Sequence, residues 1–325
     1  MPKLPRVYVT RNIPKPGLDL LREECEVEVW DSDDAIPKDE LLKHVPGIDG
    51  LLCMLTDRID KEVLEAAGPQ LKCVGTMSVG YEHIDVEECK SREIRVSNTP
   101  NVSTDSVSEL TVALLLLTSR RLLEGVDAVK QGAWGKWKPM WLCGMEMVHR
   151  TIGILGLGRI GYGVARRLKP FGVSKIIYHD VCKVSYADDV GAEFVPFDQL
   201  VAESDVICIC CNLTPQTKHK FNMVTFKKMK KHAILINSGR GGVVHHDDLF
   251  DALTSGEIGA AGLDVTEPEP LPASHPLVSL HNCIILPHMG SNTIDSRNSM
   301  AETAAKNILA CFSNKDAIGD VIVYR

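Results

Sequence analysis

The sequence predicts an α/β protein built from two Rossmann-like domains with parallel sheets, and three observations support this class. The chain has 325 residues, more than one typical domain holds. Apolar strand patterns alternate with amphipathic helical patterns along both halves. A glycine-rich turn typical of nucleotide-binding domains begins only at Gly156, so a sizeable segment precedes it.

The strand and helix patterns define an order of elements. Strands are expected at 7–10, 27–30, 50–55, 71–76 and 95–97, and then at 152–156, 175–179, 206–210, 233–237, 260–264 and 283–286. Helices are expected at 18–24, after Pro37, at 61–67 and at 160–169. A long helical pattern at 106–130 carries leucine on more than one face, which predicts burial between domains or subunits.

The last helical pattern sets the domain boundaries. It follows the polar segment 291–299 and runs through residue 310, and we expect it to return to the first domain. The nucleotide domain is then inserted into a discontinuous substrate domain. Residues 1–104 plus 296–325 form the substrate domain, and residues 105–295 form the dinucleotide-binding domain with the long linker helix.

The glycine turn carries the first functional signal. Gly156, Gly158 and Gly161 form G-x-G-x-x-G between an expected strand and an expected helix, and the next strand ends at Asp180. The first glycine permits a tight turn, the second allows close approach of a pyrophosphate, and the third allows helix and strand to pack. Strand, turn, helix and terminal acid together predict dinucleotide binding, whereas the glycine pattern alone would be weak.

Composition excludes several other classes. The net charge of −7 argues against nucleic-acid binding, and the most apolar run, 110–117, is too short to span a membrane. Most of the eleven cysteines lie in apolar runs, and their odd number fits no complete disulfide framework. The group Cys208, Cys210 and Cys211 lies along one strand without a histidine in register, so we expect no metal site. A cytoplasmic location is expected.

Three further strand ends carry residues suited to the chemistry of 2-oxo acids. Arg240, Glu269 and His288 follow the expected strands at 233–237, 260–264 and 283–286. Ligands of open parallel sheets collect at the carboxyl ends of strands, so these side chains are expected to converge. Arg240 would hold a substrate carboxylate, His288 would donate a proton to the forming alkoxide, and Glu269 would orient His288 and favour its protonated form.

With these motifs in place, the chain resembles the D-2-hydroxyacid dehydrogenases over nearly its whole length, and within them the animal glyoxylate/hydroxypyruvate reductases. The segments that carry the resemblance are 30–33, 76–85, 137–144, 156–161, 166–172, 263–266 and 287–291. The resemblance implies that Arg240, Glu269 and His288 are the catalytic residues. It further implies that the N–H groups of Val79 and Gly80 bind the substrate carboxylate.

The resemblance also assigns residues to the cofactor and to a partner subunit. It implies a homodimer in which Trp137 or Trp141 reaches the partner's substrate site, although ordinary packing would explain these tryptophans equally well. Asp264 would contact the nicotinamide amide. The residues expected to contact the cofactor are Gly156, Gly158, Arg159, Ile160, Gly161, Asp180, Asn212, Ser238, Asp264 and Gly290.

The cofactor choice departs from the habit of the subfamily. Reductases of this kind often carry small and basic residues after the second strand, which suit the 2′-phosphate of NADP. Here Asp180 would accept the ribose hydroxyls of NAD and repel a 2′-phosphate, with His179 and Lys183 partly offsetting that repulsion. NAD(H) is therefore expected over NADP(H).

Reduction of glyoxylate to glycolate and of hydroxypyruvate to D-glycerate is the expected activity. A D-lactate dehydrogenase that reduces pyruvate is the alternative on the same scaffold. An alternative of another class is an NAD(H)-sensing corepressor like the C-terminal binding proteins, which keep much of the catalytic trio. A formate dehydrogenase would be expected to have glutamine in place of Glu269. A phosphoglycerate dehydrogenase remains possible, although the sequence shows no extra cluster of basic residues for the phosphate of its substrate.

Overall fold

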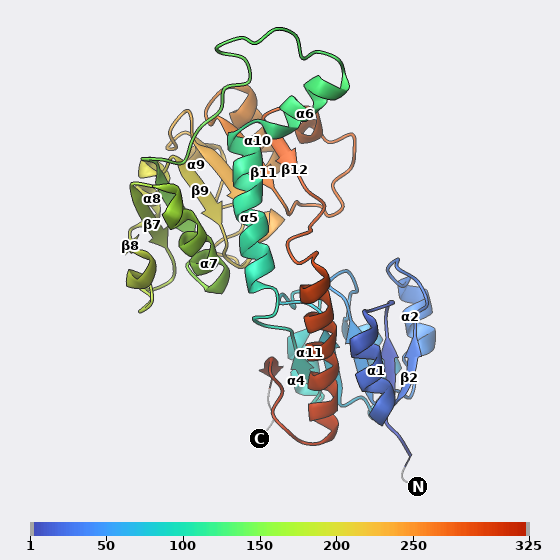
Figure 1. Ribbon diagram of the computed structural model, residues 1–325. Coiled ribbons are helices and arrows are strands. Elements are labelled where there is room, and N and C mark those ends of the chain that lie inside the picture. The colour runs from blue at the N-terminus through green and yellow to red at the C-terminus, as the bar shows by residue number, and fades with distance from the viewer. Residues whose placement is uncertain (1–2, 323–325) are drawn as a thin grey trace. The chain divides into compact units, whose positions relative to one another are not determined.

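Two parallel sheets organise the chain, each in its own unit of the computed structural model, which describes residues 3–322 (Figure 1). The first unit runs to Ser103 and resumes at Asn292, and the second unit comprises Thr104–Ser291. The α/β class with two parallel-strand sheets is thus confirmed.

The sheet of the first unit has the strand order β13-β5-β4-β3-β1-β2. Its strands are β1 (Arg6–Val9), β2 (Glu26–Val29), β3 (Gly50–Cys53), β4 (Cys73–Thr76), β5 (Arg95–Ser97) and β13 (Asp320–Ile322). All neighbours are parallel except β13, which pairs antiparallel with β5. The strand β13 was not predicted, because a strand of three residues carries too little pattern to be recognised.

Helices cover both faces of this sheet. The helices α1 (Lys15–Glu24) and α11 (Ile294–Phe312) pack with Val7 and Val9 on one face. The helices α2 (Lys38–His44), α3 (Lys61–Ala67) and α4 (Val86–Ser91) pack with Tyr8 on the other. The alternation of Val7, Tyr8 and Val9 between two cores follows from the two-residue period of a strand. The six-residue helix α4 was not predicted.

The sheet of the second unit has the order β12-β11-β10-β9-β6-β7-β8, and every pair is parallel. Its strands are β6 (Thr151–Leu155), β7 (Lys175–His179), β8 (Ala192–Phe194), β9 (Val206–Ile209), β10 (Ile234–Asn237), β11 (Ala260–Leu263) and β12 (Cys283–Ile285). The chain reverses its direction across the sheet between β6 and β9. In open parallel sheets ligands bind outside the carboxyl ends of the strands at such a reversal.

The helices of the second unit divide between the two faces of its sheet. The helices α5 (Thr104–Ser119) and α7 (Arg159–Leu168) cover one face, and α8 (Phe197–Glu203), α9 (Met223–Phe226) and α10 (His246–Thr254) cover the other. Short 3-10 helices lie at Lys169–Phe171, Asp188–Val190, Gly241–Val243 and Pro276–Ser279.

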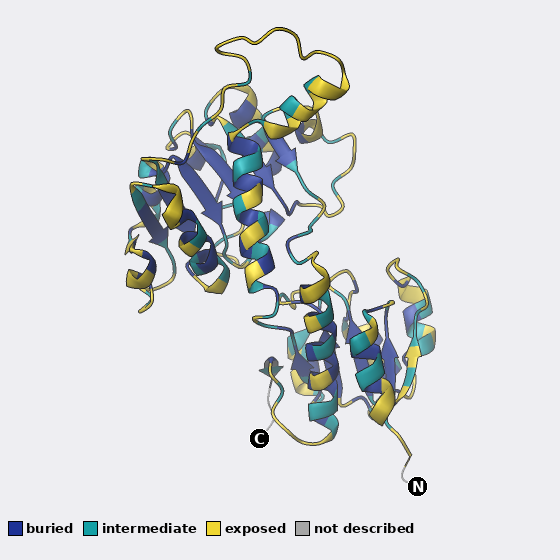
Figure 2. Cartoon of the chain, viewed as in Figure 1, coloured by how far each residue is buried: buried dark blue, intermediate teal, exposed yellow. Residues whose placement is uncertain are grey.

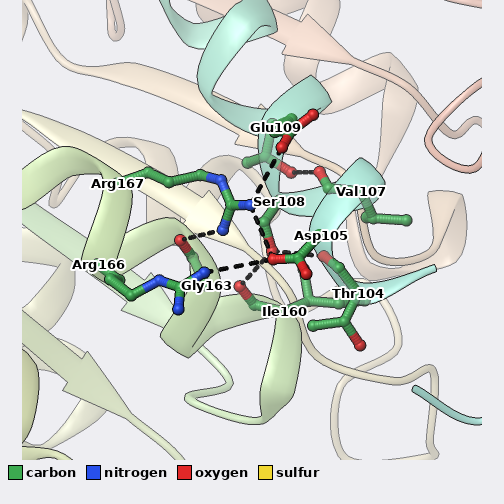
Figure 3. Close-up of polar contacts among 10 residues, drawn as sticks. Thr104, Asp105, Val107, Ser108, Glu109, Ile160, Gly163, Arg166 and Arg167 are labelled. Atoms are coloured by element: carbon green, nitrogen blue, oxygen red, sulfur yellow. Dashed lines mark hydrogen bonds and ion pairs between the residues drawn. The ribbon is translucent and has the colours of Figure 1, made fainter. Parts of the chain in front are cut away.

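Polar contacts fix the first turns of α5 against α7 (Figure 3). The guanidinium of Arg167 pairs with Asp105 at 2.8 Å and with Glu109 at 3.2 Å. The Ser108 hydroxyl donates to the Ile160 carbonyl at 3.2 Å, and a Cβ on Gly163 would lie only 3.0 Å from the Cβ of Ser108. The helix that begins at the glycine turn therefore has a rigid neighbour.

The single helix expected at 106–130 is two helices. Arg121 adopts the left-handed conformation with φ 53° and ends the run, and α6 (Leu122–Lys130) begins after it. The Arg121 guanidinium then pairs with Glu124 at 2.6 Å. Of the two helices, only α5 is buried as expected. Its Leu114 and Leu115 lie in the core, whereas none of the residues of α6 is buried (Figure 2). A left-handed arginine has no sequence signature, because glycine and asparagine are the usual residues there.

Three general properties of the chain concern its thiols, metal binding and membrane insertion. All eleven cysteines are free thiols, and most are buried. Within residues 3–322 no three His, Cys, Asp or Glu side chains gather closely enough to hold a metal ion. That part of the chain also lacks a helix with the length and apolar character needed to cross a bilayer.

Candidate active site

Every catalytic or cofactor-contacting residue predicted in the second unit follows the carboxyl end of one of its strands. The glycine turn follows β6, Asp180 follows β7 and Ser238 follows β10. Asp264 and Glu269 follow β11, and His288 follows β12. Because all seven strands are parallel, these ends share one edge of the sheet.

The three glycines of the turn meet different surroundings. Gly156 has φ 89°, and a Cβ there would lie 2.9 Å from the backbone of Cys211. A Cβ on Gly161 would overlap the carbonyl oxygen of Gly156, so the helix can approach the turn only with glycine at this position. Gly158 has nothing within 4 Å of its Cβ direction. The open position is the one at which a pyrophosphate has to approach the backbone.

The start of α7 provides donors beside that open position. Gly158 is the N-cap residue and offers no side chain to the N–H groups of the first turn, which includes Arg159 and Ile160. Free N–H groups and the positive end of the helix dipole favour a phosphate here. The residues present therefore fit a dinucleotide.

The carboxylate of Asp180 is tied to the glycine turn. Its oxygens accept the N–H of Leu157 at 2.8 Å and the N–H of Val181 at 2.7 Å. His179 and Lys183, the two cationic candidates nearby, face Phe194 instead. The His179 ring stacks on the Phe194 ring and binds the Val195 carbonyl at 3.0 Å, while the Lys183 ammonium lies 5.9 Å from the Phe194 centroid.

His288 and Glu269 form a hydrogen-bonded pair. Nδ1 of His288 lies 2.8 Å from Oε2 of Glu269, and the other carboxylate oxygen accepts the N–H of Thr266 at 2.9 Å. Burial raises the pKa of Glu269, but the bond and charge of His288, the Thr266 N–H and the charge of Arg240 outweigh it and hold that pKa below its ordinary value. The pair is thus an ionised carboxylate that orients an imidazole, and Arg240 lies near enough to act on it.

Asp264 fixes the turn that carries His288. Its two carboxylate oxygens accept the N–H groups of Met289 at 2.8 Å and Gly290 at 2.9 Å, while its carbonyl accepts the N–H of His288 at 2.9 Å. His288 adopts φ 52°, a conformation that needs such support in a residue other than glycine. Burial raises the pKa of Asp264, opposed by these N–H groups and by His288. Asp264 and Gly290, expected at the cofactor, therefore also shape the His288 turn.

The remaining predicted residues divide between exposed and buried positions. Asn212 is exposed in the loop after β9. Ser238 is buried, and its hydroxyl accepts that of Thr111 at 2.7 Å. Trp137 is 84% exposed and Trp141 38% exposed, which ordinary packing within the subunit does not explain.

Val79 and Gly80 belong to the first unit. Their carbonyl oxygens accept the amide of Asn98 and the hydroxyl of Ser78, each at 2.6 Å. These bonds hold the turn through its carbonyl groups and leave its N–H groups to the role expected from the sequence.

Sequence reasoning missed two residues beside the catalytic candidates, His219 and Glu267. His219 follows β9, and its imidazole lies 2.9 Å from the carboxylate of Glu267, two residues before Glu269. A lone histidine in a polar loop and an acid beside prolines carry no recognisable spacing, so only their contact in space identifies them.

Known proteins match this chain along most of its length. The profile of D-isomer specific 2-hydroxyacid dehydrogenases, NAD binding domain, matches residues 112–290. The chain is 52% identical over 311 residues to human glyoxylate reductase/hydroxypyruvate reductase, covering 95% of each. It is 44% identical over 310 residues to the glyoxylate reductase of Pyrococcus horikoshii, covering 94% of this chain and 92% of the relative.

Solved structures show the same likeness. A crystal structure of a protein from Thermus thermophilus superposes with a TM-score of 0.92 at 41% identity, covering 98% of this chain and 100% of that one. An NADPH-dependent glyoxylate/hydroxypyruvate reductase from Sinorhizobium meliloti, solved with NADP and malonate, gives a TM-score of 0.82 at 31% identity. The match covers 98% of this chain and 96% of that one.

Proposed function

Because the chain belongs to the D-isomer specific 2-hydroxyacid dehydrogenases, we propose that it reduces glyoxylate to glycolate and hydroxypyruvate to D-glycerate. Membership makes it an oxidoreductase that transfers a hydride between a nicotinamide cofactor and a small 2-oxo or 2-hydroxy acid. The observation that carries the site assignment is the His288–Glu269 pair at 2.8 Å, with the charge of Arg240 acting on it, at the edge that bears the glycine turn.

Each residue has a distinct task in this reaction. When bound, the nicotinamide cofactor supplies the hydride that reaches the carbonyl carbon. Arg240 binds the substrate carboxylate through its planar guanidinium, and Val79 and Gly80 add N–H donors to that carboxylate. His288 gives its proton to the carbonyl oxygen as negative charge develops there, and the product is the 2-hydroxy acid. Glu269 keeps the imidazole oriented and stabilises its cationic form.

A spectrophotometric panel tests this activity. Glyoxylate, hydroxypyruvate, pyruvate and oxaloacetate are each supplied with NADH and with NADPH, using wild type and His288→Gln. We expect glyoxylate and hydroxypyruvate to give the highest kcat/KM, and the variant to keep less than about a tenth of the wild-type kcat, since general acid catalysis contributes at least about a hundredfold. Its affinity for NADH should stay near that of wild type.

Other outcomes of the panel identify the alternatives. Preference for pyruvate would make the protein a D-lactate dehydrogenase. Tight NADH binding without turnover of any acid would favour the corepressor-like role. A variant with wild-type kcat would remove His288 from proton transfer.

We also propose that the cofactor is NAD(H) in preference to NADP(H). The carboxylate of Asp180 would accept the ribose hydroxyls and repel a 2′-phosphate, and both neighbouring cationic groups are turned to Phe194. Unit charges about 4 Å apart repel by roughly 4 kcal/mol at an effective dielectric constant near 20, and solvent screening reduces this. We expect a preference for NADH of at least about tenfold in kcat/KM.

The variant Asp180→Gly tests the cofactor assignment. NADH loses charge-assisted hydrogen bonds in this variant, while NADPH escapes a repulsion, so the ratio of the two kcat/KM values should approach one or reverse. A wild type that prefers NADPH would contradict the proposal.

A homodimer in the cytoplasm completes the proposal. The apolar side chains of α6 are 42–58% exposed: Leu122, Leu123, Val126 and Val129. An exposed apolar face of this kind suits a second copy of the chain. Light scattering should give twice the mass of one chain for wild type and the mass of one chain for Val126→Asp.

The eleven free thiols suit a reducing compartment, which supports the proposed cytoplasmic location. Cell fractionation would test this location.

A further inference from the structure

Three loops of the carboxyl edge meet at one ion pair that the catalytic assignment leaves unused. Nε2 of His219 lies 2.9 Å from Oε2 of Glu267. The backbone N–H of His219 donates to the carbonyl of Gly242 at 2.8 Å. His219 therefore binds the loop after β10 through its backbone and the loop after β11 through its side chain.

The same two loops are in van der Waals contact beside the ion pair. A Cβ on Gly241 would overlap the carbonyl of Thr266, and a Cβ on Gly242 would lie 3.3 Å from both carboxylate oxygens of Glu267. Arg240 directly precedes Gly241. A shift of Glu267 would therefore press on the segment that holds Arg240.

The loop of Glu267 also carries Glu269. The N–H of Thr266 binds Oε1 of Glu269 at 2.9 Å, and the Thr266 hydroxyl donates to the Pro268 carbonyl at 2.8 Å. The path from His219 to the imidazole of His288 thus runs through Glu267, Thr266 and Glu269. The path to Arg240 runs through Gly242.

We propose that the His219–Glu267 pair is a positioning device that sets Arg240 and Glu269 relative to each other. This inference rests on the proposed dehydrogenase function. A substrate held by Arg240 has to present its carbonyl oxygen to His288, which Glu269 orients. Small misplacements of such groups lower turnover strongly, and they also weaken the binding of an analogue that has to contact both groups.

Titratable groups of neighbouring loops surround the pair. The ring of His245 meets that of His219 edge to face at 4.9 Å, and Nδ1 of His245 lies 3.2 Å from the carboxylate of Asp248. Burial, with His275 nearby, lowers the pKa of His246 to about 4, so His246 is neutral near pH 7. His246 therefore adds no positive charge beside Glu267 near pH 7.

The variants Glu267→Gln and His219→Asn separate position from charge. Glutamine is isosteric and still accepts a hydrogen bond from neutral His219. Asparagine tolerates the left-handed conformation that His219 adopts at φ 48°, but its side chain is too short to reach Glu267. The matched control is His232→Asn, because His232 forms the same kind of pair with Asp205 at 2.8 Å at the amino-terminal edge of the same sheet.

We expect each variant to lower kcat for the preferred 2-oxo acid by about three- to tenfold, as coupled neighbours do, with the Kd for NADH unchanged. The double variant should lose no more than either single variant. The KM for the 2-oxo acid should change less than kcat, since misplacement of the reacting groups acts mainly on turnover. The His232→Asn control should keep the wild-type kcat and KM.

A structural role alone would lower stability in the variants and the control alike and lower kcat by the same factor in all of them, which would overturn the proposal. If wild type reduces no 2-oxo acid, the dehydrogenase proposal fails by itself. Calorimetric binding of oxamate to the NADH complexes then decides the inference: weaker binding to His219→Asn than to His232→Asn supports it, and equal binding overturns it.

Discussion

Replacing Glu269 with glutamine separates the two hydrogen bonds that its carboxylate accepts. One oxygen accepts from Nδ1 of His288 at 2.8 Å and the other accepts the N–H of Thr266 at 2.9 Å. Glutamine has a single acceptor oxygen, so one of the two donors loses its partner, and the imidazolium of His288 loses its counter-charge in either arrangement.

The size of the effect follows from the exposure of the pair. A hydrogen bond to a charged group contributes about 1.5–3 kcal/mol, and both side chains of this pair are 33% exposed, which favours the lower end. We therefore expect kcat for 2-oxo acid reduction to fall about tenfold.

The assay measures kcat in both directions across the neutral and alkaline range. Glu257→Gln serves as control, since Glu257 pairs with Lys231 at 2.5 Å on the surface. Oxidation of the 2-hydroxy acid needs the neutral imidazole and should suffer less than reduction. A variant that keeps more than half of the wild-type kcat for reduction would refute the role of Glu269.

Four further variants test other parts of the site and fold. Arg240→Lys keeps the charge but not the two-pronged grip, so kcat/KM for 2-oxo acids should fall about ten- to a hundredfold; an unchanged value would make Arg240 a bystander. Gly158→Ala has room for its methyl group and should weaken NADH binding at unchanged Tm, whereas Gly161→Ala should lower both; equal Tm values would contradict this contrast. Burial opposes ionisation of Asp205, but Lys230, the Thr151 N–H and His232 outweigh it and lower its pKa from 3.8 to about 2. The ionised carboxylate of Asp205 adds about 2 kcal/mol to the free energy of unfolding above pH 3.8, and this contribution is lost as pH falls toward 2. In urea unfolding, Asp205→Asn should therefore be less stable than wild type by this amount at pH 7. Near pH 2 the two proteins should differ little.

The predictable part of the fold is the part with strong periodicity. The helix α3 and the strands β5 and β7 have the predicted ends, Lys61–Ala67, Arg95–Ser97 and Lys175–His179. In each of these elements, a polar residue marks the point where an apolar or amphipathic stretch of sequence begins or ends. Among the elements that were not predicted, α4, β8, α9 and β13 have three to six residues, too few for a period to stand out. The helices α8 and α10, with seven and nine residues, were not predicted either.

The carboxyl edge was predictable for a related reason. A parallel sheet brings every strand end to one edge, so the sequence positions of Asp180, Arg240 and His288 after buried strands already imply proximity. What the sequence could not supply is the path by which each side chain is held. The contacts of Asp264 with the N–H groups of Met289 and Gly290 join residues 25 and 26 positions apart.

The break at Arg121 and the contact of His219 with Glu267 share a physical cause. Arg121 and His219 both adopt left-handed backbone conformations, with φ 53° and 48°, in residues that do not favour them. Such conformations persist only where the surroundings impose them, through the Glu124 pair in one case and the Gly242 and Glu267 contacts in the other. In both places the strain turns the chain toward a surface with a proposed task, α6 toward a second subunit and the His219 loop toward the reacting groups. At these two positions, backbone strain that a sequence pattern cannot reveal therefore coincides with a segment that has a proposed role.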